Sequence, residues 1–107
     1  MHTVVETNQF QKRSKALRIT PNEVTEIITT LAQNPNSGDS LGGGLHKVRI
    51  ANQSGGYRVL YFYKPQNMPL FLLTIFAKSE KDNISQAEKN VLIELCNNLT
   101  QTYRSQS

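Results

Sequence analysis

Cysteine, histidine and long apolar runs are scarce in this sequence, and each shortage excludes a class of protein. With Cys96 as the only cysteine, neither an internal disulfide nor a zinc site made of cysteines can form. His2 and His46 lie far apart and the acidic residues are scattered singly, so no metal site and no cofactor are predicted. No stretch reaches the roughly 18 apolar residues of a transmembrane helix. The N-terminus also lacks the pattern of a secretory signal, and a cytoplasmic protein is therefore expected.

Basic residues are more numerous than acidic ones. The chain of 107 residues has 12 lysines and arginines against 8 aspartates and glutamates, a formal net charge of +4. This balance favours an anionic partner, although a merely soluble basic domain would have it too. The length predicts one domain over residues 1–107 with a single two-layer core.

Periodicity and capping signals predict an α+β fold. A small antiparallel sheet, made of a short N-terminal strand and a three-stranded meander, is expected to pack against an N-terminal helical hairpin, with a C-terminal helix at the end of the chain. Capping boxes begin the second helix at Thr20 and the last helix at Ser85. The predicted bounds are strands at 3–6, 45–51, 57–63 and 70–77, and helices at 8–17, 21–34 and from 85 onward.

The meander is joined by predicted turns at 52–56 and 64–69 and preceded by a glycine-rich segment at 34–44. That segment is expected to be an irregular loop. It is not a Walker-type phosphate loop, because no Gly-Lys-Ser/Thr follows and it leads into a strand. Alternation along the first meander strand places His46 on the inward face, as a partly buried side chain, and Lys47 and Arg49 on the other face.

Cations and tyrosines are concentrated in the meander. Arg58 begins the second strand, where it can approach Lys47 and Arg49 across the strand pair. Tyr57 and Tyr61 add planar surfaces on which unpaired bases can stack, a pattern typical of single-stranded RNA binding. The alternative is that the cations are solvated and the tyrosines pack in the core. The segment from Gly44 to Asn83, which contains the meander, carries six cations: Lys47, Arg49, Arg58, Lys64, Lys78 and Lys81.

The order of three segments, KVRIANQSGGYRVLYFY, LFLLTIF and AKSEKDNIS, resembles the RelE/HigB branch of the RelE/ParE toxin superfamily. The resemblance covers essentially the whole chain, and its most specific parts are GGYRVLY and LLTIFAKSEK. It implies the toxin of a type II toxin–antitoxin pair, which is a ribosome-dependent mRNA endonuclease. Such enzymes need no metal: the 2′-hydroxyl of the RNA attacks the adjacent phosphate and leaves a 2′,3′-cyclic phosphate and a 5′-hydroxyl. The implied partners are mRNA on the ribosome and a cognate antitoxin, a small helix-turn-helix protein.

In-line attack requires a base, stabilisation of the charged phosphorane and an acid for the 5′-oxygen. Lys47, Arg49 and Arg58 occupy basic positions of the family motif, and charge stabilisation is the role that the resemblance implies for them. Cations that crowd a lysine favour its neutral form, which makes Lys47 or Lys78 the candidate base. Lys81, with the two tyrosines named above, is predicted to bind RNA.

The sequence departs from the RelE pattern at two positions. Ser79 stands where that pattern has an arginine, and Ser85 stands where it has a tyrosine. The general acid is therefore unassigned, and Tyr61 or Lys81 is the candidate to supply the group that the missing tyrosine would provide. Two alternatives remain open: a ParE-like toxin that inhibits DNA gyrase, and a catalytically weak relative that binds RNA or protein. A protein-binding poison has no need for the basic strand residues, which favours the nuclease.

Overall fold

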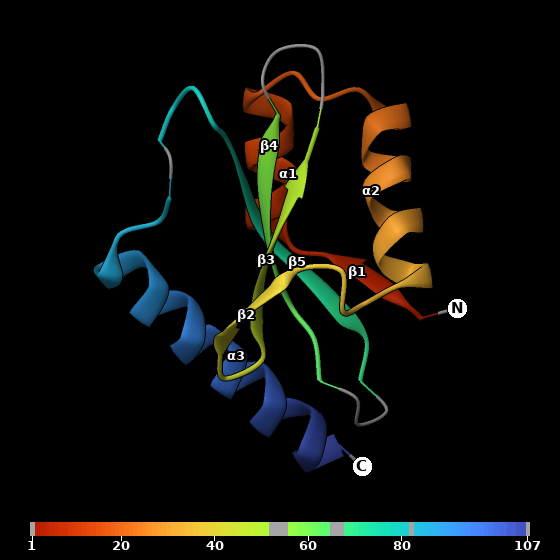
Figure 1. Ribbon diagram of the computed structural model, residues 1–107. Helices are drawn as coiled ribbons and strands as arrows, with labels where there is room; N and C mark the ends of the chain where they lie inside the picture. The colour runs from red at the N-terminus through yellow and green to blue at the C-terminus, as the bar shows by residue number, and fades with distance from the viewer. Residues whose placement is uncertain (1, 52–55, 65–67, 82, 107) are drawn as a thin grey trace.

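The computed structural model describes residues 2–51, 56–64, 68–81 and 83–106, which form three helices and a five-stranded sheet (Figure 1). Every predicted element is present, and each bound predicted above lies within one residue of the observed one. The tail from Thr102, which its polar sequence predicts to be frayed, is instead helical as far as Gln106. Most of the two predicted turns, 52–55 and 65–67, lies outside the described residues. The elements are β1 (Val4–Glu6), α1 (Asn8–Ala16), α2 (Pro21–Gln33), β2 (Asp39–Gly42), β3 (Leu45–Ile50), β4 (Tyr57–Phe62), β5 (Leu70–Ala77) and α3 (Gln86–Gln106).

The strand order in the sheet is β1-β5-β4-β3-β2. β3, β4 and β5 form the predicted antiparallel meander, whereas β1 pairs in parallel with β5, so the sheet is mixed and mostly antiparallel. β2 lies within the segment that was predicted to be an irregular loop, and that prediction was wrong for Asp39–Gly42. Its sequence, DSLG, has little strand propensity, and the strand exists because it pairs with β3 along an otherwise open edge.

Helices cover both faces of the sheet (Figure 1). Phe10 of α1 and Ile27 and Leu31 of α2 pack in one cluster of buried residues, together with the strand residues that point to that face of the sheet. Cys96 of α3 belongs to a second cluster, with strand residues that point to the opposite face. The predicted single core is therefore two clusters separated by the sheet. None of the described helices is long and apolar enough to cross a membrane.

Side-chain caps define where the helices begin. The Thr20 hydroxyl accepts a hydrogen bond from the Glu23 amide (3.1 Å), and the Glu23 carboxylate accepts one from the Thr20 amide (3.0 Å). Ser85 and Glu88 make the same reciprocal pair, at 3.1 and 3.0 Å. Both predicted capping boxes are confirmed, and each satisfies two N–H groups that would otherwise lack a partner at a helix start.

A tight turn at residues 42–44 connects β2 to β3 and brings the backbone against a core ring. Gly44 has φ +89°, and a Cβ there would lie 2.5 Å from the Cε1 atom of Phe62, which is fully buried. Gly42 has a similar φ of +98° but no atom within 4 Å of a Cβ. Gly44 is thus required by both backbone conformation and packing, whereas Gly42 is required by conformation alone.

This contrast predicts different costs for two alanine substitutions. Gly44→Ala should lower the free energy of unfolding by about 3 kcal/mol, from backbone strain and overpacking together, and Gly42→Ala by about 1 kcal/mol from strain alone. Urea unfolding of the two variants and the wild type measures the difference. Equal losses would show that the Phe62 ring moves aside without cost.

Candidate functional site

The register of β3 on β4 places three cations on one face of the sheet. Arg49 lies directly opposite Arg58, and Lys47 lies opposite Leu60. Leu60 packs in the α3 cluster, and side chains alternate along a strand, so Lys47, Arg49 and Arg58 all lie on the α3 side. We call these three residues the cation face. The predicted approach of Arg58 to the other two is confirmed by the pairing.

Arg58 is the most enclosed member of the cation face. Only 8% of its surface is exposed, while Arg49 is exposed and Lys47 is half-buried. Arg58 lies between its cross-strand neighbours Arg49 and Phe76, and its Nη1 atom is 3.4 Å from the Tyr57 carbonyl oxygen. A guanidinium held this way has little conformational freedom and presents planar, paired N–H donors, a geometry that suits phosphate.

Asn83 connects the cation face to the segment between β5 and α3. Its Oδ1 atom accepts a hydrogen bond from Lys47 Nζ (3.1 Å) and another from the Ile84 amide (2.9 Å). Asn83 is not among the predicted site residues, because an asparagine just before a helix cap is ordinary in sequence. Its link to Lys47, 36 positions away, exists only in the folded chain.

Lys81 lies beside the cation face and is held by two contacts. Its Nζ atom lies 5.1 Å from the centroid of the Phe76 ring and 2.5 Å from Glu88 Oε2. The same Glu88 carboxylate accepts the Ser85 amide in the capping box. The Lys81 hydrogen bond, followed by the Ser85 backbone bond, lowers the pKa of Glu88 from 4.5 to about 2.

The other predicted cations lie at the ends of the strands. Lys78 is exposed immediately after β5, and its backbone amide donates to the Gly56 carbonyl (3.2 Å), at the end of the sheet where β4 begins. Lys64 follows the opposite end of β4, where its Nζ atom lies 5.9 Å from the centroid of the Phe62 ring. The structure therefore groups Lys81 with the cation face, leaves Lys78 near its margin and separates Lys64 from it.

The predicted stacking tyrosines lie on the other face of the sheet. Tyr61 is fully buried; its hydroxyl donates to the Pro35 carbonyl (2.8 Å) and accepts from the Gly38 amide (3.0 Å), and burial raises its pKa. Tyr57 packs against the cluster under α1 and α2. The expectation that these two residues offer stacking surfaces beside the cations is corrected, because strand alternation directs them away from the cation face.

His46 is half-buried, as predicted, and lies on the same face of the sheet as Tyr61. Its ring stacks on Tyr61 with centroids 5.1 Å apart, and its Nδ1 atom is 2.9 Å from the Gly44 carbonyl oxygen. Throughout the described ranges, no group of three His, Cys, Asp or Glu side chains is arranged to hold a metal ion.

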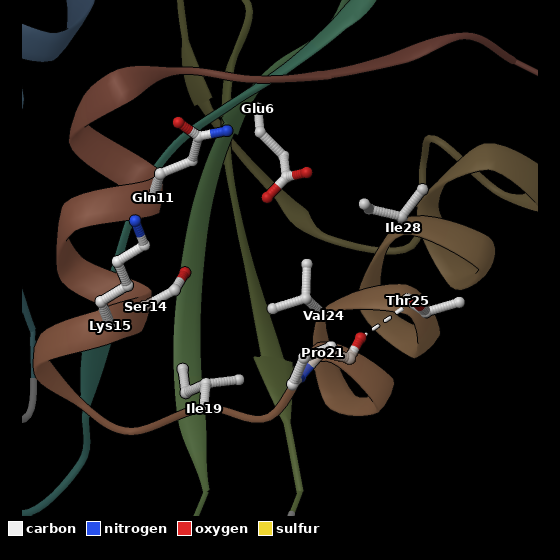
Figure 2. A pocket seen from close by; sticks show the side chains of 9 residues that line it. All are labelled: Glu6, Gln11, Ser14, Lys15, Ile19, Pro21, Val24, Thr25 and Ile28. Carbon is white, nitrogen blue, oxygen red and sulfur yellow. Dashed lines mark hydrogen bonds between the residues drawn. The ribbon is translucent and has the colours of Figure 1, made fainter.

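A pocket of about 420 Å³ lies between α1 and α2, with Glu6 pointing into it (Figure 2). Its apolar lining, which includes Ile19, Val24 and Ile28, belongs to the cluster under the helical hairpin. The pocket is therefore on the face opposite the cations and is not part of their site.

The lowered pKa of Glu88 predicts a pH-dependent contribution to stability. A carboxylate whose pKa falls on folding contributes stability above its ordinary pKa, and that contribution is lost as the pH falls from 4.5 toward 2. Glu88→Gln retains an acceptor for the Ser85 amide but removes the charge, so its free energy of unfolding should fall less over this pH range than that of the wild type. The effect will be small because the ion pair is partly exposed.

Urea unfolding at a series of pH values measures this difference. Glu94→Gln is the matched control, since Glu94 is an exposed glutamate on the same helix. If the Glu88 and Glu94 variants have the same pH dependence, the ion pair with Lys81 contributes nothing to stability.

The chain resembles a known protein family along nearly its whole length. The chain matches the family model described as "RelE toxin of RelE / RelB toxin-antitoxin system" over residues 2–106. The matched range contains the whole cation face, Lys78, Lys81 and Asn83. The resemblance inferred from the order of the strand motifs is thereby confirmed.

Proposed function

Because this chain belongs to the RelE toxin family and is the toxin of a type II toxin–antitoxin system, we propose that it is a metal-independent endoribonuclease that cleaves mRNA on the ribosome. In this reaction the 2′-oxygen forms a bond to the adjacent phosphorus and the bond from phosphorus to the 5′-oxygen breaks. The products are a 2′,3′-cyclic phosphate and a 5′-hydroxyl. The cation face supplies the charge that the pentavalent phosphorane needs.

The observation that carries this proposal is the pairing of Arg49 with Arg58 at directly opposed positions of two strands. Like charges at opposed positions destabilise a sheet. A polyanion bound between them converts that repulsion into attraction, and the 8% exposure of Arg58 limits competition from water. The arrangement thus favours a phosphate ligand over a purely structural role.

Lys47 is the better candidate for the base that removes the 2′-proton. It lies on the same face as the two arginines and is oriented by Asn83, whereas Lys78 is exposed beyond the end of β5. Asn83 accepts the hydrogen bond from Lys47 Nζ through its Oδ1 atom and so holds the amine on this face of the sheet. Asn83 is in this scheme a positioning residue that acts through Lys47.

Lys81 is the remaining candidate to protonate the departing 5′-oxygen and to bind the RNA backbone. Tyr61 is unavailable for this role, because it is buried on the other face. The Ser85 hydroxyl is already engaged, because it accepts a hydrogen bond from the Glu88 amide and caps α3. Lys81 reaches the cation face across the Phe76 ring, since Phe76 is the cross-strand neighbour of Arg58.

The cognate antitoxin follows from membership of the family. We propose that it is a small helix-turn-helix protein with a segment that covers the cation face, using acidic or apolar residues. Occlusion of the cations would exclude mRNA and stop the reaction.

Removal of the Arg58 guanidinium tests the site directly. Arg58→Ala should slow cleavage of ribosome-bound mRNA by about a hundred-fold or more, because one preorganised charge on the phosphorane is lost. The rate is measured with purified toxin and programmed ribosomes, and mass spectrometry of the fragments identifies the cyclic phosphate. Lys12→Ala, which removes an exposed cation of α1, is the control and should cleave like the wild type. Unchanged cleavage by an Arg58→Ala protein with a wild-type melting curve would show that the site is elsewhere.

The roles of Lys47 and Asn83 are separated by a double-mutant cycle. Lys47→Met and Asn83→Ala should each lower the single-turnover cleavage rate by about ten-fold or more, with little change in ribosome affinity. In the Lys47→Met background, Asn83→Ala should have no further effect, because Asn83 acts only through Lys47. Losses that multiply in the double variant would show that Asn83 acts independently of Lys47.

A further inference from the structure

The last part of β5 is bordered by side chains of the N-terminal segment, where β1 no longer pairs with it. β1 stops pairing with β5 at Leu72. Beyond that point the Thr7 hydroxyl contacts the Leu73 carbonyl oxygen (3.2 Å), and Arg13 Nε donates a hydrogen bond to the Ile75 carbonyl (3.2 Å). The Arg13 guanidinium is therefore attached to the edge of β5, close to the end of the strand.

Glu80 joins this edge to the turn that follows β5. Its Oε1 atom accepts hydrogen bonds from Arg13 Nη2 (2.6 Å) and from the Ala77 amide (3.0 Å). The Glu80 amide donates to the Ala77 carbonyl (3.0 Å), which closes the turn through the backbone as well. The Ala77 amide, followed by the Arg13 guanidinium, lowers the pKa of the Glu80 carboxyl. We call Arg13 and Glu80 the clamp, because together they attach the turn to α1 and to the end of β5.

Stability alone does not account for the clamp. The side chains of Arg13 and Glu80 are 30% and 40% exposed, and ion pairs at such exposure typically contribute little to the free energy of unfolding. Both residues line a groove of about 710 Å³ between α1, β5 and α3, so the turn borders open space on this side. The contacts do restrict geometry, because one planar guanidinium binds the edge of β5 and the turn at the same time.

Lys81 is the group whose position depends on the clamp. It follows Glu80 directly, and its amide nitrogen lies 3.4 Å from the Ala77 carbonyl oxygen. Its Nζ atom lies 5.1 Å from the centroid of the Phe76 ring, and Phe76 is the cross-strand neighbour of Arg58. A rotation of the turn would therefore move the Lys81 amine away from the cation face.

We propose that Arg13 and Glu80 are positioning residues for mRNA cleavage, which act through Lys81 by holding the turn that carries it beside the cation face. The inference rests on the proposed function, in which Lys81 protonates the departing 5′-oxygen. Proton transfer requires the donor within hydrogen-bond distance of that oxygen, and a displacement of about 1 Å can cost about a hundred-fold in rate. Glu88 holds the amine of Lys81, whereas the clamp holds the backbone from which that side chain extends.

Charge alone predicts the opposite effect for Glu80. A carboxylate beside an RNA-binding surface repels phosphate, so its removal would strengthen RNA binding if charge were its only role. The clamp predicts that the same removal slows cleavage. Because the two roles have opposite signs, Glu80 is the position at which they are best separated.

Glu80→Ala removes the clamp, whereas Glu80→Gln retains an Oε1 acceptor for both hydrogen bonds. Glu26→Ala is the matched control, an equal change at an exposed glutamate of α2. Single-turnover cleavage of mRNA on programmed ribosomes and ribosome affinity are measured for each variant, in the wild-type and Lys81→Met backgrounds. NMR of the selectively labelled Lys81 side chain reports its proximity to the Phe76 ring without mRNA.

We expect Glu80→Ala to lower the cleavage rate at saturating ribosomes by about ten-fold or more without weakening ribosome binding. Glu80→Gln should recover most of the rate, and Glu26→Ala should cleave like the wild type. Arg13→Ala should match Glu80→Ala, and the two together should lose no more than either alone. In the Lys81→Met background Glu80→Ala should have no further effect on the rate. In the otherwise wild-type protein it should move the Lys81 resonances toward those of an exposed lysine.

Wild-type cleavage by the Glu80→Ala protein, or a loss that persists in the Lys81→Met background, would overturn the proposal. Unchanged Lys81 resonances would overturn it as well, and so would loss of the fold, which would make the clamp a structural contact. Failure of the nuclease proposal would be seen separately, as absent cleavage by the wild-type toxin while the Lys81 resonances still respond to Glu80→Ala.

Discussion

Pairing between β3 and β4 aligns Val48 with Val59 and Arg49 with Arg58, and both core clusters and the cation face depend on this alignment. Successive side chains point to opposite faces, so a shift of one residue would exchange the cations with the apolar residues that contact α1 and α2. Burial on both faces resists such a shift, because Val59 is fully buried beneath the helical hairpin and Leu60 beneath α3. The turn at Gly44 supports the same register by bringing the backbone against Phe62.

The same register has a cost, which is the direct opposition of two arginines. A sheet selected for stability alone would place an oppositely charged or apolar pair there. The sheet still forms, because most residues of β4 and β5 are buried and the stabilisation from that burial offsets the repulsion. Local conflicts of this kind are expected at functional sites, where a bound ligand relieves the repulsion between like charges that folding alone leaves in place.

α3 contributes to the core and to the surroundings of the cation face. Its inner stripe completes the core, and its capping box holds Glu88 where it also binds Lys81. The segment before it carries Asn83, which orients Lys47. Val91 and Leu95, on its outer side, are exposed and line a groove that Lys81 also borders.

Local signals in the sequence determined the elements, the caps and the parity of the side chains. Thr20 and Ser85 marked helix starts, and alternation around Lys47 and Arg49 gave one basic face, because these patterns depend on neighbours within a few residues. Only the tertiary structure decided what depends on distant pairing. β2 forms because β3 offers it an edge, and Tyr61 is buried because distant segments cover the face to which it points, with the Pro35 carbonyl and the Gly38 amide as partners of its hydroxyl. The bond from Asn83 to Lys47 and the groove beside Val91 likewise join residues that the fold brings together and that no local pattern in the sequence relates.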